Sequence, residues 1–206
     1  GSAARQLGRK RVLTEIFGVS RHTNTFEQFR WIGNYNLVLG ATFFVPHLTW
    51  YAARGRRKRD YPPVWNYQQT YWDDLNPLND YFTRVAHALQ SGEPVCDILV
   101  LHPVENAAAG RRLGVRTRGQ EDAGAVRMPV DPPGASQAEG ELVDRMLRMT
   151  LDAILTSGQE ADLGDESYLE EMGHAEDGAL RVGRMCYRLV VVPPSVTWRP
   201  STLALL

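Results

Sequence analysis

The first half of the chain alternates short apolar runs with longer amphipathic stretches. A β-prone run at residues 11–14 ends at Glu15, and a continuous apolar run follows at residues 41–46. Helical spacing of apolar side chains covers residues 26–39 and again residues 76–90. Strand, helix, strand, long loop and helix, in this order, is typical of an α/β protein whose parallel strands alternate with helices.

Local signals mark where these two helices begin and end. Thr25 can accept a hydrogen bond as an N-cap, and Gly40 suits the left-handed residue that follows a helix. Residues 76–77 open the second helix, and Gly92 ends it. Both helices are therefore predicted with defined ends.

The second half of the chain begins with a third strand and repeats the α/β pattern. Residues 95–101 form a continuous apolar run, and residues 141–156 have helical periodicity. Residues 105–140 are rich in Gly, Ala, Pro and Arg without periodicity, and they are predicted as an irregular insertion. Further short elements are expected at residues 160–173 (a brief strand and a helical turn), 179–182 and 187–192 (strands), and 201–206 (the first turn of a helix).

Composition and charge narrow the classes of function. The chain has 206 residues, of which 43% are apolar, and a formal net charge of -1. Such a charge gives no general attraction to nucleic acid or anionic lipid, and no run reaches the ~20 apolar residues of a membrane span. The basic run at residues 54–59 is interpreted as a solvated loop, with nucleic-acid binding as a lesser hypothesis. Cys96 and Cys186 lie in strand-like runs and are predicted as buried free thiols.

Glu15 is the strongest candidate for a catalytic residue. It follows a predicted parallel strand, and in βα-barrels the carboxyl ends of the strands carry the active site. A solvent-facing glutamate at a strand end is the plainer alternative. An aromatic loop after the next strand favours a binding site, because four of the five tryptophans lie between residues 31 and 72. Aromatic faces with amide and imidazole donors suit sugars, and the candidate contacts are His47, Trp50, Tyr51, Gln68 and Trp72.

Two other groupings do not indicate a cofactor. Asp162, Asp165 and Glu166 lack the spacing of a calcium loop, so they are predicted as a solvated acidic surface rather than a metal site. No loop of Gly, Ser and Thr that could cradle a phosphate follows Leu101, so no flavin is expected. We therefore predict a protein without a metal or an organic cofactor.

Four blocks of the sequence are RVLTEIFG, FEQFRWIGNYNLVLGATFFVPH, YPPVWNYQQTYWDDLNPLNDYFTRVAHALQSG and CDILVLHP. Together they resemble a group of large bacterial glycoside hydrolases akin to the α-L-rhamnosidase family and, more distantly, to the β-galactosidase-type barrel enzymes. The resemblance covers about residues 2–104 and does not extend over residues 105–140. It resumes weakly at residues 141–206, which resemble the flavodoxin-like domain, of β-galactosidase trimerisation type, that follows such barrels.

The resemblance implies roles for two residues. The Thr14-Glu15 pair would end the seventh strand of a (β/α)8 barrel, with Glu15 as the second catalytic carboxylate. It would act as the nucleophile in a retaining enzyme or as the general base in an inverting one. His47 would end the eighth strand and contact the substrate. The general acid would come from an earlier strand, so the chain is expected to be a fragment that is inactive by itself.

We therefore predict an α/β protein in two parts. Residues 2–92 would come from the C-terminal end of a (β/α)8 barrel, and residues 93–206 from an incomplete flavodoxin-like domain. The predicted function is hydrolysis of terminal glycosides, α-L-rhamnosides among the candidates, by the full-length protein. The alternative is a non-catalytic carbohydrate-binding or oligomerisation module. A carbohydrate is the expected partner, whereas nucleic acid and membrane are not. The sequence does not decide whether the full-length protein forms a homo-oligomer. It also does not decide whether the protein is cytoplasmic or exported.

Overall fold

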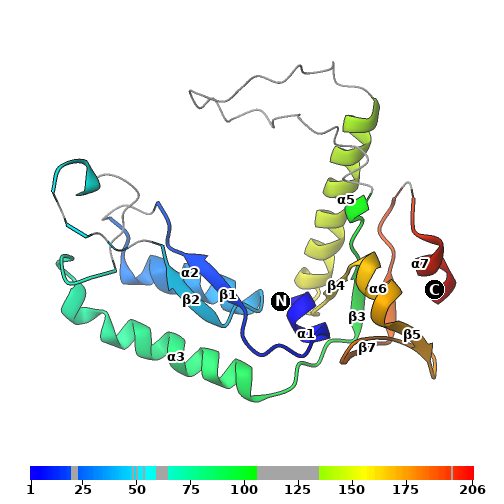
Figure 1. Cartoon of the computed structure of the whole chain (residues 1–206), viewed down its shortest axis with the longest axis horizontal. Coiled ribbons are helices and arrows are strands. Elements are labelled where there is room, and N and C mark those ends of the chain that lie inside the picture. The colour runs from blue at the N-terminus through cyan, green and yellow to red at the C-terminus, as the bar shows by residue number, and fades with distance from the viewer. Residues whose placement is uncertain are drawn as a thin grey trace. The chain divides into compact units, whose positions relative to one another are not determined.

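The chain folds into two compact units. A computed structural model describes residues 1–19, 23–47, 49, 51–52, 54–58, 65–105, 135–195 and 197–206. Unit 1 is Gly1–Pro94 and unit 2 is Val95–Leu206 (Figure 1). Each unit has its own hydrophobic core. Both units combine helices with small sheets, so the chain is a mixed α/β protein as predicted. None of the helices among the described residues has the length and apolar character needed to cross a membrane.

Unit 1 is built around two parallel strands, each of which is followed by a helix. Its elements are α1 (Ser2–Gln6), β1 (Leu13–Ile16), α2 (Phe26–Val38), β2 (Phe43–Pro46), η1 (Gly55–Lys58), η2 (Trp72–Asp74) and α3 (Asn76–Ser91). β1 and β2 pair in parallel, with Leu13 opposite Phe43 and Ile16 opposite Pro46. Parallel neighbours need a crossover connection, and α2 supplies it.

The ends of α2 follow the predicted signals. The Thr25 hydroxyl accepts from the Gln28 backbone N–H at 3.2 Å, and the Gln28 side chain accepts from the Thr25 N–H at 2.9 Å. This reciprocal pair is a complete capping box. At the other end Gly40 has a φ of 92°, a left-handed conformation that glycine adopts without steric cost.

The strands of unit 1 are less buried than their apolar sequence predicts. Ile16 and Phe44 pack into the core formed with α2 and α3, whereas Leu13 and Phe43 are exposed on the opposite face. Successive side chains of a strand point to opposite faces, and helices of the described part of unit 1 cover only one of them. In the described part of unit 1, helices therefore cover one face of the β1–β2 pair and leave the other face exposed.

Gly33 is the point of close approach between α2 and α3. A Cβ atom at this position would lie 2.3 Å from Cε1 of Phe82, a ring that is itself buried in the core. We expect Gly33→Ala to destabilise the chain by roughly 1–2 kcal/mol, because the overpacking cost exceeds the gain in helix propensity.

Urea denaturation of the 206-residue chain measures this effect. Gly92→Ala is the matched control, because an added Cβ there meets nothing within 4 Å and its φ of -96° suits alanine. The control should stay within about 0.5 kcal/mol of the original chain. Equal stabilities of the two variants would contradict the close approach of the helices.

Unit 2 contains one parallel and one antiparallel sheet. Its elements are β3 (Ile98–Leu101), α5 (Ala135–Thr156), β4 (Asp162–Gly164), α6 (Glu166–Met172), β5 (Gly173–Glu176), β6 (Ala179–Val182), β7 (Met185–Tyr187), β8 (Leu189–Val191) and α7 (Pro200–Leu205). β3 lies between β4 and β8 and is parallel to both, while β5, β6 and β7 form an antiparallel sheet. The β3 side chains are the centre of the core, because Leu99, Val100 and Leu101 are fully buried.

Two expectations for unit 2 need correction, and one strand was not expected. The run at residues 187–192 is not one strand, since the chain passes from β7 to β8 at Arg188 and changes sheet. β5 has too little apolar pattern to be predicted from the sequence. The helix expected at residue 141 begins at Ala135, and residues 106–134 of the predicted insertion lie outside the described residues. Cys96 is buried and Cys186 half-buried, and both are free thiols.

The acidic residues of β4 and of the start of α6 do not form the solvated surface that their composition indicated. Asp162 and Glu166 are both buried. One Asp162 oxygen accepts from the Tyr187 hydroxyl at 2.9 Å. One Glu166 oxygen accepts from the Arg199 backbone N–H and the Thr202 hydroxyl, both at 2.7 Å. Buried carboxylates require such partners, and here they come from segments distant in the sequence.

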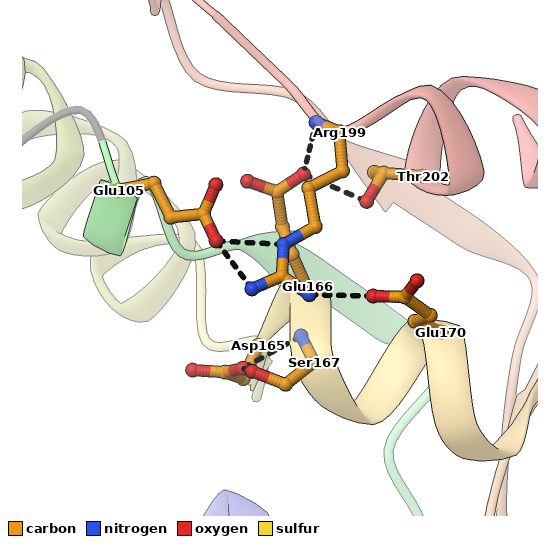
Figure 2. Close-up of polar contacts among 7 residues, drawn as sticks. All are labelled: Glu105, Asp165, Glu166, Ser167, Glu170, Arg199 and Thr202. Carbon is orange, nitrogen blue, oxygen red and sulfur yellow. Dashed lines mark hydrogen bonds and ion pairs between the residues drawn. The ribbon is translucent and has the colours of Figure 1, made fainter.

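Arg199 joins the segments that follow the parallel strands of unit 2. Figure 2 shows its guanidinium between Glu105, which follows β3, and Glu170 of α6. Its Nε donates to Glu105 at 2.6 Å, and its Nη1 donates to Glu170 at 2.5 Å. These bonds raise the pKa of Arg199. Beside them, a hydrogen bond from the Ser167 hydroxyl holds the pKa of the Asp165 carboxyl below its usual range.

Candidate active site

Glu15 lies near the carboxyl end of β1, on the face of the sheet that the helices leave open. It pairs with Val45 of β2, and its side chain is 66% exposed. Ile16, the next residue, points into the core. The strand alternation therefore places the Glu15 carboxylate in solvent at the end where the two parallel strands finish.

His47 follows β2 and extends the pairing of the two strands by one step. Its backbone N–H donates to the Ile16 carbonyl at 2.8 Å, so its position is set by the sheet. Its Nε2 lies 3.4 Å from Glu15 Oε1, and only 22% of its side chain is exposed. This is an ion pair when the imidazole is protonated, and long contacts of this kind are common in sites without a bound substrate.

The turn after Glu15 has an unusual backbone. Phe17 has a φ of 66° and Val19 a φ of 56°, both in the left-handed region that side chains with a Cβ rarely adopt. The Phe17 ring is stacked on Trp65 at 5.0 Å and meets Phe29 edge-on at 4.9 Å. Such strain persists only where surrounding packing holds it, and it is concentrated at functional sites.

The other predicted contacts are spread over the aromatic loop. Trp50 lies outside the described residues. Tyr51 is 95% exposed, and Trp72 is exposed at the start of η2. The half-buried Gln68 donates from its amide to the Tyr67 hydroxyl at 3.4 Å. The structure thus brings together Glu15 and His47, while Tyr51, Gln68 and Trp72 have no described contact with that pair.

Part of the aromatic loop belongs to the core. Trp65 stacks on Phe17, and Tyr71 meets Phe26 edge-on at 5.7 Å. Burial raises the pKa of the Tyr71 hydroxyl. These two side chains therefore pack against the core of unit 1.

A cavity of about 540 Å³ lies in unit 1, and Phe17 and Pro46, each within two residues of Glu15 or His47, are among its lining residues. Residues of β2 and α3 line much of it, including Phe43, Phe44, Phe82 and His87, and neither Glu15 nor His47 is among its lining residues. None of its lining residues is an aspartate or a glutamate, so the cavity by itself offers no carboxylate for acid–base or nucleophilic chemistry. The candidate site is therefore the end of the β1–β2 pair.

The chemistry available at this end is that of one carboxylate beside one imidazole. A carboxylate in this position can attack a carbon atom or activate a water molecule. Glycoside hydrolysis also needs a second carboxyl group across the scissile bond. Among the described residues, no group of His, Cys, Asp and Glu side chains is arranged to hold a metal ion.

Two residues that shape this site could not be identified from the sequence. Gly18 approaches the His47 ring closely, and Phe17 takes a left-handed conformation that its type does not suggest. The available signal was a glycine three residues after Glu15. A glycine after a strand indicates a turn, but it does not tell which side chain the turn approaches.

A solved structure of a rhamnosidase from Novosphingobium sp. PP1Y resembles this chain, with a TM-score of 0.64 and 14% sequence identity. The match covers 98% of this chain and 17% of that chain. No protein family model matches the sequence, and no curated protein matches it either. At 14% identity the likeness establishes the fold alone. The chain therefore has a fold that occurs within a rhamnosidase, and it spans 17% of that protein's length.

Proposed function

We propose that this chain is part of a larger glycoside hydrolase that cleaves terminal glycosides, with α-L-rhamnosides as the first candidates. Residues 2–92 would supply the last two strand–helix units of a (β/α)8 catalytic barrel, and residues 93–206 the start of a flavodoxin-like domain. The likeness to a rhamnosidase structure supports this assignment at the level of the fold.

The position of Glu15 on the open face of the sheet carries the proposal. In a (β/α)8 barrel the helices cover the outside of the strands, the other face points to the barrel centre, and the active site lies at the carboxyl ends. Ile16 and Phe44 face the helices, whereas Glu15 is on the opposite face. Glu15 would therefore point into the active site of the closed barrel.

The strand order of unit 2 supports its assignment to the flavodoxin-like class. In that class the first strand lies between the second and the third. β3 lies between β4 and β8, as this order requires, with α5 as the first crossover. The antiparallel β5–β7 sheet is a departure from the class. Ligands of this fold bind where the strand order reverses, and Arg199 with Glu105 occupies the corresponding end of β3 and β8. We therefore assign unit 2 a structural role.

Glu15 would be one member of a pair of carboxyl groups. In a retaining enzyme it attacks the anomeric carbon, and in an inverting one it removes a proton from the attacking water. The partner acid protonates the leaving oxygen and must stay protonated at working pH. We expect this acid to come from an earlier strand of the full-length protein, so the 206-residue chain by itself should not hydrolyse glycosides.

Hydrolysis of aryl glycosides by the full-length protein tests the proposal. We expect release of 4-nitrophenol from the α-L-rhamnoside above that from other 4-nitrophenyl glycosides, with the anomer of the product, followed by NMR, giving the stereochemistry. The isolated 206-residue chain is the negative control. Binding of rhamnose-containing oligosaccharides without hydrolysis of any glycoside would instead indicate a non-catalytic binding module.

A further inference from the structure

The His47 ring is held between two groups that come from the same segment of the chain. On one side its Nε2 lies 3.4 Å from Glu15 Oε1. On the other side is Gly18, where an added Cβ would lie 3.3 Å from His47 Cγ and 3.4 Å from its Cβ. Glu15 therefore approaches the imidazole at Nε2, and Gly18 approaches it at Cγ, where the ring joins Cβ.

A side chain at residue 18 would crowd this approach. Gly18 does not have a left-handed φ, so its backbone conformation would accept an alanine. The added methyl group, however, would press on the His47 ring, since 3.3 Å is shorter than a usual contact of two carbon atoms. Glycine at this position therefore allows the imidazole to lie where it does.

The aromatic core fixes the turn that carries Gly18. Phe17 is buried and has a φ of 66°, and its ring contacts Trp65 and Phe29. A left-handed residue with a bulky side chain is strained, so the packing of its ring must hold it. Through this packing the core determines where Gly18, and hence the imidazole, are placed.

The side chain of Glu15 is itself much less restrained than the imidazole. Its side chain is 66% exposed, and a glutamate in solvent samples many rotamers. Catalytic groups act at full rate only when they are held close to the productive geometry. The imidazole of His47, which is 22% exposed and anchored through its backbone to Ile16, is a rigid partner for the mobile carboxylate.

We propose that His47 is a positioning residue that orients the Glu15 carboxylate, and that Gly18 provides the space in which its ring lies. The inference rests on the proposed function of Glu15 and deepens it. It differs from a role of His47 as a contact of the substrate, because the group that Nε2 approaches is the carboxylate.

Kinetics of the full-length protein separate the two roles. An orienting His47 predicts that His47→Ala lowers kcat by about 10- to 100-fold with KM within about twofold, because only the geometry of the reacting carboxylate is lost. His47→Gln should recover most of the activity, since its amide nitrogen stands as many bonds from the backbone as Nε2. Gly18→Ala should give an intermediate loss of kcat, with thermal unfolding confirming that the variant is folded.

Two kinetic outcomes would overturn the proposal. A rise in KM with unchanged kcat in His47→Ala would make His47 a substrate contact, since such a change reports lost ground-state binding. Unchanged kinetics in both His47→Ala and Gly18→Ala would leave the residues without a role in the reaction.

A second measurement does not depend on catalysis. Long-range proton–nitrogen NMR spectra of the 206-residue chain report the ring nitrogens of His47 directly. We expect Glu15→Gln and Gly18→Ala each to shift the Nε2 resonance, whereas Glu93→Gln, at an exposed glutamate paired with Lys10, should leave it unchanged. If Glu15→Gln leaves the Nε2 resonance unchanged, the positioning role is overturned even if the enzyme is active. A shifted resonance together with full activity of Glu15→Gln contradicts the proposed function instead.

Discussion

Replacing Glu15 by glutamine is expected to lower kcat of the full-length protein on an aryl glycoside by about 10²- to 10⁴-fold. Glutamine keeps the shape of the side chain but can neither attack the anomeric carbon nor accept a proton. KM should change little, because the amide still fills the space of the carboxylate. Initial rates over a range of substrate concentrations measure both constants.

Glu93→Gln is the matched control, because it makes the same chemical change at an exposed glutamate in the same unit. It should retain full activity. Glu15→Ala in the presence of azide gives a sharper test, since this anion can enter the space left by the side chain and attack the anomeric carbon. Restored turnover with a glycosyl azide as product is expected. Activity of Glu15→Gln at the original level would exclude Glu15 as a catalytic residue.

Replacing Phe29 by alanine should have the largest effect on stability, a loss of about 3–5 kcal/mol. Phe29 is 0% exposed and contacts the rings of Phe17 and Trp65. Its removal leaves a cavity beneath the residues that hold the turn after Glu15. Unit 1 should therefore unfold at a lower denaturant concentration, while unit 2, which has a separate core, should keep its own transition.

Fluorescence of the 206-residue chain in guanidinium chloride follows this change, because Trp65 meets Phe29 at 5.1 Å. Trp31→Ala is the control, since it also removes an aromatic ring from α2, two residues further on, but one that is 69% exposed. Its effect should stay below about 1 kcal/mol. Similar losses for the two variants would show that Phe29 is not the centre of this core.

Helix ends could be read from the sequence because they depend on nearby residues. The Thr25 cap, the left-handed Gly40 and the start of α3 at Asn76 are all observed where the sequence indicated them. The β6 strand likewise has the predicted bounds, Ala179–Val182. These signals act over one turn or one strand, so no distant segment is needed to produce them.

Burial was predicted less well, because it depends on which segments meet. Asp162 and Glu166 have the composition of a solvated surface, yet each is buried against partners near the C-terminus, Tyr187 and Thr202. The change of sheet at Arg188 is likewise not predicted by residues 187–192, since a single arginine in an otherwise apolar run does not show that the strand ends there.

The candidate site divides in the same way. Two parallel-type strands, a glutamate at the end of the first and a histidine after the second could be read from the sequence. These follow from local patterns. The folded structure brings Glu15 Oε1 and His47 Nε2 to 3.4 Å from each other, because this distance depends on the register of β1 and β2. It also decided that Gly18 leaves room for the imidazole, since an aromatic core assembled from distant segments holds Phe17 in its left-handed conformation.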